Sequence, residues 1–569
     1  MKKYIKTFLF SCLLCITVLI AASCSHEHFY GEEWEFNDSE HWLKCSECGE
    51  TAQIESHIYS ENKVCLVCGY EKTENGELEF RLSDDGSAYI VVGIGSAETE
   101  YPVIPEIYNG KPVTEIADYA FDEEDIIGIH IPEGITSIGE AAFWGCRSLK
   151  SVDIPESVKI IGESAFDACI SLEAVIIGDG VEIIESWAFS RCQALETLTF
   201  GNALTEIGEY AFYGCSGLEN IIIPDSVESI GENCFKECAS LQSAIIGDGI
   251  KEIKDYTFSD CELLTSLTLG NKILSVGTGA FEGCRWLVEI YNFSSLEINK
   301  GDEYSNGGIG GQALDIYTSP EAKSKLSQTE DGYVFYLDGE QVYLLGYKGK
   351  EKVLTLPESF QGREYGIYGH AFSADTELFV VTIPDNVVSI GEYAFSDCES
   401  LAEVYVGKGV GNIEEGAFYN CAALVSVKFN GNVGSLGALA FSNCKSLARI
   451  ELPDSVSSIG INAFSDCIAL EEVKLSKELK VIGQGAFDGC SALVGITIPS
   501  GVEIIGKWAF RGCESLISIV FEERDIWYYA ADESFAHGRR LEVSVPEVNA
   551  VNLVIKYNGY YIKRVLQDI

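Results

Sequence analysis

The chain has 569 residues, of which 47% are hydrophobic and 22% are charged, so its composition supplies a large core and excludes disorder as the default state. Its 39 Lys and Arg against 88 Asp and Glu give a net charge of -49, which repels phosphate backbones and excludes nucleic acid as an expected partner. The 21 Cys against one Met are an unusual composition that the positions of the cysteines must explain.

The first 23 residues are predicted to be an export signal peptide. Lysines lie near the start of the chain, and residues 8–23 form an uncharged stretch. This stretch is shorter than a membrane-spanning helix, which needs about 20 residues. Small residues then precede Cys24. This run resembles a bacterial lipobox, although Ala21 stands where Leu is usual, and the resemblance implies lipidation at Cys24. Ordinary secretory cleavage near Cys24 is the alternative, so we expect an extracytoplasmic protein on the bacterial cell surface, either lipid-anchored or secreted.

Residues 24–75 are expected to form a small module rich in Cys and His. Two CxxC-Gly turns stand 16 residues apart, and each turn can point two sulfurs at one metal ion. An exported protein also permits two disulfides here, and that alternative stays open. The segment resembles small Cys/His modules on surface proteins of anaerobic gut bacteria, which implies a structural role. The predicted ligands of a closed, structural zinc site are Cys45, Cys48, Cys65 and Cys68, with His41 and His57 as possible competitors.

A 23-residue repeat occupies most of the remaining chain. In residues 148–169 the LxxVxI segment predicts a strand with one buried face, Pro155 ends it, and Gly162 opens a predicted short helical turn. One unit cannot bury its apolar residues alone, so the units are expected to stack as a solenoid with about 4.8 Å per coil. The recurring cysteines of the pattern Ala-Phe-x-x-Cys-x-x-Leu are Cys146, Cys169, Cys192, Cys215, Cys238, Cys261 and Cys284, then Cys398, Cys421, Cys444, Cys467, Cys490 and Cys513.

The repeat has a family resemblance. The string IPxSVxxIGxxAFxxCxSL, seen from Ile223 to Cys238 and from Leu452 to Cys467, resembles the BspA-like class of leucine-rich repeats. This resemblance implies a bacterial surface protein, often an adhesin that binds proteins of a host or a neighbouring cell. The predicted fold class is a leucine-rich repeat solenoid, β-rich with short helical turns, in two stacked arrays of 23-residue repeats with β-hairpin caps.

The repeat register breaks between Cys284 and Cys398, which separates the two arrays. Residues 333–347 alternate like a hairpin around Asp338-Gly339, and residues 78–93 show the same pattern before the first array. Both are predicted caps that cover a bare apolar coil and its unpaired strand edges. The expected domains are the export signal at 1–23, the Cys/His module at 24–75, a first cap and array at 76–299, a connector with the second cap at 300–350, the second array at 351–540 and a C-terminal cap at 541–569.

The recurring cysteines and the scattered histidines give little indication of catalysis. Equivalent cysteines on stacked coils should lie about 4.8 Å apart, beyond the roughly 3.8 Å between the Cβ atoms of a disulfide, so we expect buried free thiols. Cys234 replaces the Ala before Phe and is expected in the core. His130, His370 and His537 have no recurring Ser or Cys beside them. No catalytic residue is predicted, and we expect the protein not to be an enzyme.

A ligand-binding face is predicted on the first strand of each repeat. The residue between the last two apolar positions of LxxVxI should point away from the core, and stacking aligns these residues in one row. Exposed Ile176, Ile222 and Ile245 would form an apolar patch of the kind that marks contact sites, unless a cap or loop covers them. The predicted rows are Asp153, Ile176, Thr199, Ile222, Ile245, Thr268 and Tyr291 in the first array, and Thr382, Tyr405, Lys428, Glu451, Lys474, Thr497 and Val520 in the second.

These features predict a non-enzymatic, adhesin-like protein that presents its leucine-rich repeat face to protein or glycan ligands on host or neighbouring cells. The acidic surface would favour basic partners. One alternative is a structural cell-envelope protein that self-associates. Another is an enzyme acting on surface glycans, which is disfavoured because the repeats leave no segment for a compact catalytic domain. Structural zinc is the expected cofactor, and the lipid anchor is the expected membrane contact.

Overall fold

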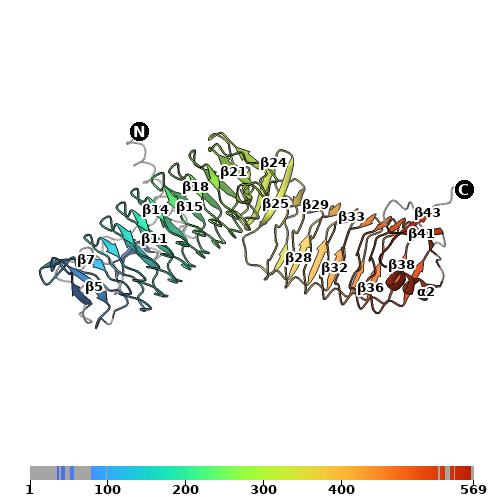
Figure 1. The fold of residues 1–569 in the computed structure, drawn as a ribbon, viewed down its shortest axis with the longest axis horizontal. Coiled ribbons are helices and arrows are strands. Elements are labelled where there is room, and N and C mark those ends of the chain that lie inside the picture. The colour runs from blue at the N-terminus through green and yellow to red at the C-terminus, as the bar shows by residue number, and fades with distance from the viewer. Residues whose placement is uncertain are drawn as a thin grey trace. The chain divides into compact units, whose positions relative to one another are not determined.

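The computed structural model describes residues 35–36, 40–44, 51–56, 78–97, 99–522, 526–531, 539–541, 543 and 545–565, the first three ranges as backbone only. The chain forms two compact units, one of Met1–Ala239 with Ile246–Phe258 and one of Ser240–Ile245 with Ser259–Ile569. Within each unit the strands of successive coils are stacked in chain order (Figure 1). The predicted fold class, a leucine-rich repeat solenoid, is confirmed.

Each coil carries a first, longer strand that forms the strand face. These strands are β9 (Ser151–Ile154), β11 (Ala174–Ile177), β13 (Thr197–Thr199), β15 (Asn220–Ile223), β17 (Ser243–Ile246), β19 (Ser266–Leu269), β21 (Glu289–Asn292), β22 (Asp315–Tyr317), β26 (Val353–Thr355), β28 (Val380–Ile383), β30 (Glu403–Val406), β32 (Ser426–Phe429), β34 (Arg449–Glu451), β36 (Glu472–Lys474), β38 (Gly495–Ile498) and β40 (Ser518–Phe521).

In most coils a second strand, usually a shorter one, follows and builds another side of the solenoid. These strands are β8 (Ser137–Ile138), β10 (Ile160–Ile161), β12 (Ile183–Ile184), β14 (Glu206–Ile207), β16 (Ser229–Ile230), β18 (Glu252–Ile253), β20 (Ser275–Val276), β27 (Tyr365–Ile367), β29 (Val387–Ile390), β31 (Asn412–Ile413), β33 (Ser435–Leu436), β35 (Ser458–Ile459), β37 (Val481–Ile482) and β39 (Ile504–Ile505).

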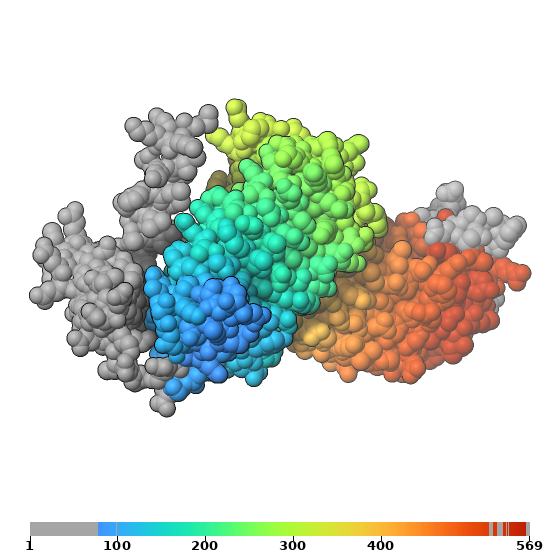
Figure 2. Space-filling view, turned by 60° about the vertical axis from the view of Figure 1, so that its left-hand side comes forward, coloured from blue at the N-terminus to red at the C-terminus, as the bar shows by residue number. Residues whose placement is uncertain are grey.

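Neighbouring coils pair as parallel strands in register. Val175 of β11 lies opposite Val152 of β9 and Leu198 of β13, so each residue stands over its equivalent 23 positions away. Strand β9 alternates exposed and buried residues, as does β15, because successive side chains point to opposite faces. The apolar residues therefore point into the coil, and Figure 2 shows the outer surface of these coils in blue and green.

The phenylalanines of the repeat form one stacked column in each unit. Phe166 is fully buried, and its ring lies 4.9 Å from that of Phe143 and 5.0 Å from that of Phe189, with planes within 7° of parallel. In the second array the centroids of successive rings, from Phe372 to Phe510, are 4.9–5.7 Å apart. Each ring thus covers the next, which is how a unit that cannot bury its own apolar residues becomes stable by stacking.

The prediction of a short helical turn after Gly162 is wrong. Ser164 and Ala168 have left-handed φ angles of 56° and 61°, and equivalent residues repeat this in other coils, so the backbone forms an arch of turns. A right-handed helix cannot include such residues. The arch instead hydrogen-bonds to the next coil, because the N–H groups of Ser164, Phe166 and Ala168 donate to carbonyls 22 residues ahead at 2.9, 2.7 and 2.8 Å.

A hairpin starts the first array, at the predicted place. Strand β4 (Glu79–Leu82) is antiparallel to β5 (Tyr89–Gly93), which runs parallel to β7 (Lys111–Ile116); β6 (Ile107–Tyr108) also pairs with β7. The order β16-β14-β12-β10-β8-β7-β5-β4 then makes one sheet. Upstream, β1 (Glu35–Phe36), β2 (Glu40–Lys44) and β3 (Thr51–Ser56) form a separate antiparallel sheet.

The second hairpin is buried on both of its faces. Strands β24 (Tyr333–Asp338) and β25 (Gln341–Tyr347) are antiparallel, and β25 runs parallel to β27. Tyr333 and Phe335 pack into the core of the second array. Val334 and Tyr336 pack on the opposite side, against Trp286 and Val288. This hairpin therefore forms a layer between two sets of coils. Strand β23 (Leu326–Gln328) pairs with β24, and the short helix η1 (Asn306–Gly308) precedes it in the chain.

The C-terminal segment closes the second array with antiparallel strands and a short helix. Strand β43 (Tyr561–Val565) is antiparallel to β39 and to β41 (Ile526–Ala530), which pairs with β42 (Arg539–Leu541). Residues 551–557 are mostly helical, because α2 (Pro546–Val551) continues as the π-helical turn η2 (Asn552–Lys556). Ala550 and Leu553 are buried against the last coils.

Candidate ligand-binding surface

The strand face of the first unit carries exposed apolar residues at the predicted positions. Ile176 is 52% exposed and Ile222 is 65% exposed, while their neighbours Val175 and Ile221 are buried. Asp153, Ile176 and Thr199 stand in register on β9, β11 and β13, and Asp153 and Thr199 are exposed as well. The prediction that this row points outward is therefore confirmed for the first unit.

In the second unit the row begins with Ile245 on β17, which is 41% exposed. Thr268 and Tyr291 follow in register and are half-buried. On the second array, Thr382 and Tyr405 are half-buried, and the exposed members are Lys428, Glu451, Lys474, Thr497 and Val520.

The charged residues on the second array's strand face largely pair with one another. Glu451 lies opposite Lys474 and accepts a hydrogen bond from its ammonium group, and Arg449 lies 3.6 Å from Glu472. Lys428 lies over the ring of Tyr405, 4.7 Å from its centroid. Such exposed pairs contribute little stability. They do reduce the attraction that each charge offers to a ligand, so the apolar row of the first unit is the stronger candidate contact surface.

The recurring cysteines serve the stack as hydrogen-bond donors. The 14 cysteines of the described part of the chain are buried and form no disulfide, as predicted, and they include Cys234. The thiol of Cys169 donates to the carbonyl of Phe143 in the preceding coil at 3.1 Å, and that of Cys467 donates to Phe441 at 3.1 Å. Burial raises the pKa of Cys467 to about 12, which keeps the thiol protonated. The sequence indicated the burial of these thiols, but it did not indicate this ladder of donors.

The predicted metal and lipid sites lie outside the described side chains. Cys24, Cys45, Cys48, Cys65, Cys68 and His57 are not among the described residues, and His41 is described only as part of the backbone of β2. Within the described part of the chain, no group of three or more Cys, His, Asp or Glu could hold a metal ion. No described helix combines the length and the apolar character needed to cross a bilayer. Zinc binding and lipidation therefore stay predictions.

The two histidines whose side chains are described, His130 and His370, belong to different units. His130 is exposed at the surface, but desolvation of its ring lowers its pKa more than the nearby carboxylates Glu106 and Asp153 raise it. His370 is half-buried and stacks on Tyr393 with ring centroids 5.5 Å apart. His537 is outside the described residues. Neither arrangement places a nucleophile beside a base.

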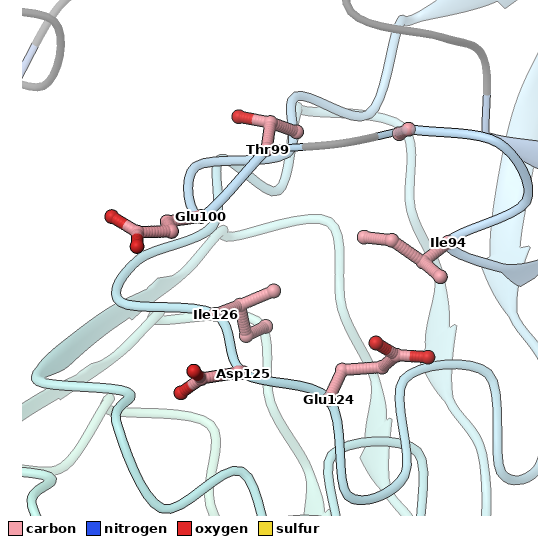
Figure 3. Close-up of a pocket in the computed structure, with 7 residues that line it drawn as sticks. Ile94, Thr99, Glu100, Glu124, Asp125 and Ile126 are labelled. Atoms are coloured by element: carbon pink, nitrogen blue, oxygen red, sulfur yellow. The ribbon is translucent and has the colours of Figure 1, made fainter.

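A small acidic recess lies next to the first hairpin, with a volume of about 280 Å³. Ile94 and Ile126 point into it, whereas the carboxylates of Glu100 and Asp125 point away (Figure 3). Asp125 already accepts a hydrogen bond from Ser148. The carboxylates therefore do not converge on a point where they could act as an acid and base pair.

A polar network that the sequence did not indicate lies between the arrays. Glu289, at the start of β21, is fully buried and accepts a hydrogen bond from the backbone N–H of Lys325 at 2.6 Å. Asp315 lies beside Glu289 in register on β22 and binds the ammonium groups of Lys325, at 2.5 Å, and Lys300, at 3.3 Å, together with the hydroxyl of Tyr336. These residues lie in the segment that breaks the repeat, so no periodicity pointed to their pairing.

This network predicts a pH dependence of stability. Burial alone would raise the pKa of Asp315, but hydrogen bonds from Lys325, Tyr336 and Lys300 outweigh it and hold the pKa at about 2, below the ordinary 3.8. Because the folded pKa is the lower one, the contribution of Asp315 is complete above about pH 4 and is lost as the pH falls toward 2. Denaturant titrations across that range should show a smaller loss of unfolding free energy for Asp315→Asn than for the wild type. Equal losses would contradict the role of this carboxylate.

Comparisons with known proteins agree with the geometry of the coils. The profile of the BspA type leucine rich repeat region, in six copies, matches residues 114–226, 192–305, 365–493 and 435–549. These matches cover more than half of the chain, which therefore belongs to the BspA-type leucine-rich repeat family. Among curated proteins, no sequence matches it.

Several solved structures are similar to this chain. A leucine-rich cell surface protein from Faecalibacterium prausnitzii is 24% identical over 71% of this chain and 94% of its own, with a TM-score of 0.32. A leucine-rich repeat protein from Bacteroides ovatus is 26% identical over 76% and 95%, also with a TM-score of 0.32. The leucine-rich repeat protein of T. pallidum is 31% identical over 37% and 87%, with a TM-score of 0.30.

Proposed function

We propose that the protein is a non-enzymatic, adhesin-like protein of the bacterial cell surface that binds protein or glycan ligands through its strand face. The observation that carries this proposal is the exposure of Ile222, which is 65%, on a strand whose other face is completely packed. An apolar side chain held outward on a rigid sheet loses little conformational freedom on binding, and desolvating it favours association.

Three features of the chain support this proposal. The chain belongs to a family of leucine-rich repeat proteins, and one similar solved structure is that of a leucine-rich cell surface protein. The first unit presents Ile176, Thr199 and Ile222 in one row, in which Asp153 is the charged member. The net charge of -49 favours a ligand with a basic surface. The lipid anchor at Cys24 and the structural zinc of the Cys/His module remain part of the proposal, because they would hold the solenoid outside the cell and stabilise its N-terminal end.

The proposal is tested by screening the full chain against immobilised host matrix proteins, surface glycans and its own cell-wall fraction. A strand-face variant, Ile222→Asp, should weaken binding of the best ligand at least about tenfold, as expected for loss of a buried contact worth about 1.4 kcal/mol or more. The matched control is Leu274→Asp, since Leu274 is also 65% exposed but lies outside the strand face.

The outcomes separate the candidate functions. Equal binding by the wild type and Ile222→Asp would show that this face is not the contact surface. Binding to the cell-wall fraction or to itself, with no host ligand, would favour the structural envelope protein. Release of reducing sugars from the glycans would favour the enzyme.

A further inference from the structure

A pocket of about 540 Å³ lies where the repeat register ends in the second unit. Its floor is the arch of the last regular coil, Gly277–Cys284, and its wall is the loop that contains η1. The backbone of this loop takes the place of a further coil, because the N–H of Phe281 donates to the carbonyl of Gly307 at 3.0 Å. The pocket is separate from the strand face.

The pocket exists because side chains present in other coils are absent here. Gly279 has a φ of 59°, and its equivalents Trp187, Tyr210 and Tyr256 have φ angles of 61°, 55° and 54° but carry large rings. Gly283 likewise takes the place that Arg191 and Glu237 occupy in other coils. Gly279 and Gly283 are half-buried, and neither has a side chain that could cover the arch.

Glycine is also required in the wall. A Cβ atom at Gly307, which has a φ of 64°, would lie 2.4 Å from the carbonyl oxygen of Gly277, and one at Gly310 would lie 2.2 Å from the carbonyl oxygen of Asn299. The loop can approach the last coil closely only because these residues have no side chain. The result is a fixed recess rather than a collapsed end of the array.

The groups around the pocket are an aromatic ring and a mixture of donors and acceptors. Tyr304 is 94% exposed, so both faces of its ring are open to a ligand. Glu282 and Glu303 offer carboxylate acceptors. Arg285 donates to the carbonyl and the hydroxyl of Ser373 at 3.1 and 3.0 Å, both from Nη1, which holds the guanidinium at the edge of the pocket. His370 lies beside it, and burial together with the charge of Arg285 lowers its pKa, which favours the neutral imidazole.

We propose that this pocket binds a neutral sugar residue, with its ring against Tyr304 and its hydroxyl groups bonded to Glu282, Glu303 and Arg285. A hydroxyl both donates and accepts, so it suits carboxylates and a guanidinium in one pocket. An anionic ligand is disfavoured because two carboxylates face one guanidinium, within a protein of net charge -49. The volume falls in the range of ligand sites, about 300–1,000 Å³.

The test is saturation-transfer NMR and calorimetry on the full chain with triacetylchitotriose, maltotriose and mannotriose at about 10 mM. At least one trisaccharide should bind. Gly279→Trp fills the pocket with the ring that an equivalent coil already carries, so the variant should fold with an unchanged melting temperature and lose binding at least about tenfold. Tyr304→Ala should weaken binding by about the same factor. The control Tyr119→Ala, at a residue 52% exposed in the other unit, should bind as the wild type does.

The proposal is overturned if none of the three sugars binds, or if Gly279→Trp and Tyr304→Ala bind like the wild type. Loss of sugar binding in Ile222→Asp, with no change in the two pocket variants, would place the sugar on the strand face. That result would reject the pocket while leaving the proposed function of the strand face intact.

Discussion

Replacing Phe166 by Ala is expected to lower the free energy of unfolding of the first unit by about 3–5 kcal/mol. The side chain is fully buried between Phe143 and Phe189, so its removal leaves a cavity that parallel rings on both sides prevent from collapsing. Because each coil contacts only its neighbours, the loss should also let the stack open at this coil first. Guanidinium denaturation and amide hydrogen exchange of residues 150–190 measure the two effects.

The matched control is Phe379→Ala, since Phe379 is 50% exposed at the edge of β28. Its loss should change stability by about 0.5 kcal/mol or less. Similar losses for the two variants would mean that the phenylalanine column does not carry the stability of the stack.

Replacing Gly346 by Ala is expected to cost about 3 kcal/mol in the second unit. A Cβ atom here would lie 1.8 Å from Cζ2 of Trp286 and 2.5 Å from the carbonyl oxygen of Ala371. Trp286 is itself packed against the hairpin by Val334 and Leu345, so the ring has little room to move. The substitution should separate the hairpin from the coils that it covers, which would appear as faster hydrogen exchange in β24 and β25.

Gly495→Ala is the control for this prediction, because a Cβ atom there would meet the carbonyl oxygen of Ser518 at an ordinary 3.5 Å. Its stability should match or slightly exceed that of the wild type, since Ala restricts the unfolded chain. If Gly346→Ala is as stable as Gly495→Ala, the hairpin is not wedged against Trp286.

The repeated part of the fold was predictable from the sequence because one physical pattern recurs at a fixed interval. The alternation around Val152 and Ile154 predicted which side chains point inward, and the burial of both residues confirms it. The same alternation predicted that Ile176 and Ile222 point outward. The arch was wrongly expected to be helical, because its apolar spacing suits a helical turn while left-handed residues such as Ser164 and Trp187 give no sign of their φ angle in the sequence.

The connector was beyond sequence reasoning, because its contacts are non-local and non-repeating. Asp315 and Lys325 pair across a segment with no periodicity, and Arg285 binds Ser373 across 88 positions. The glycine run at 306–311 was visible in the sequence, but nothing there showed that its backbone would replace a coil and leave a pocket. Sites built from broken repeats require the three-dimensional arrangement.

The most direct test of the account is a series of electron-spin distances along one row of equivalent positions. Labels attached through a ketone-bearing amino acid leave the thiols untouched, and Asp385, Asp454, Lys477 and Ser500 occupy the same place in four coils with exposed side chains. Pairing the label at 385 with each of the others should give distances of about 14, 19 and 24 Å, rising by about 4.8 Å for each coil. Distances that do not rise in equal steps of this size would contradict the stacking on which the binding face and the pocket both depend.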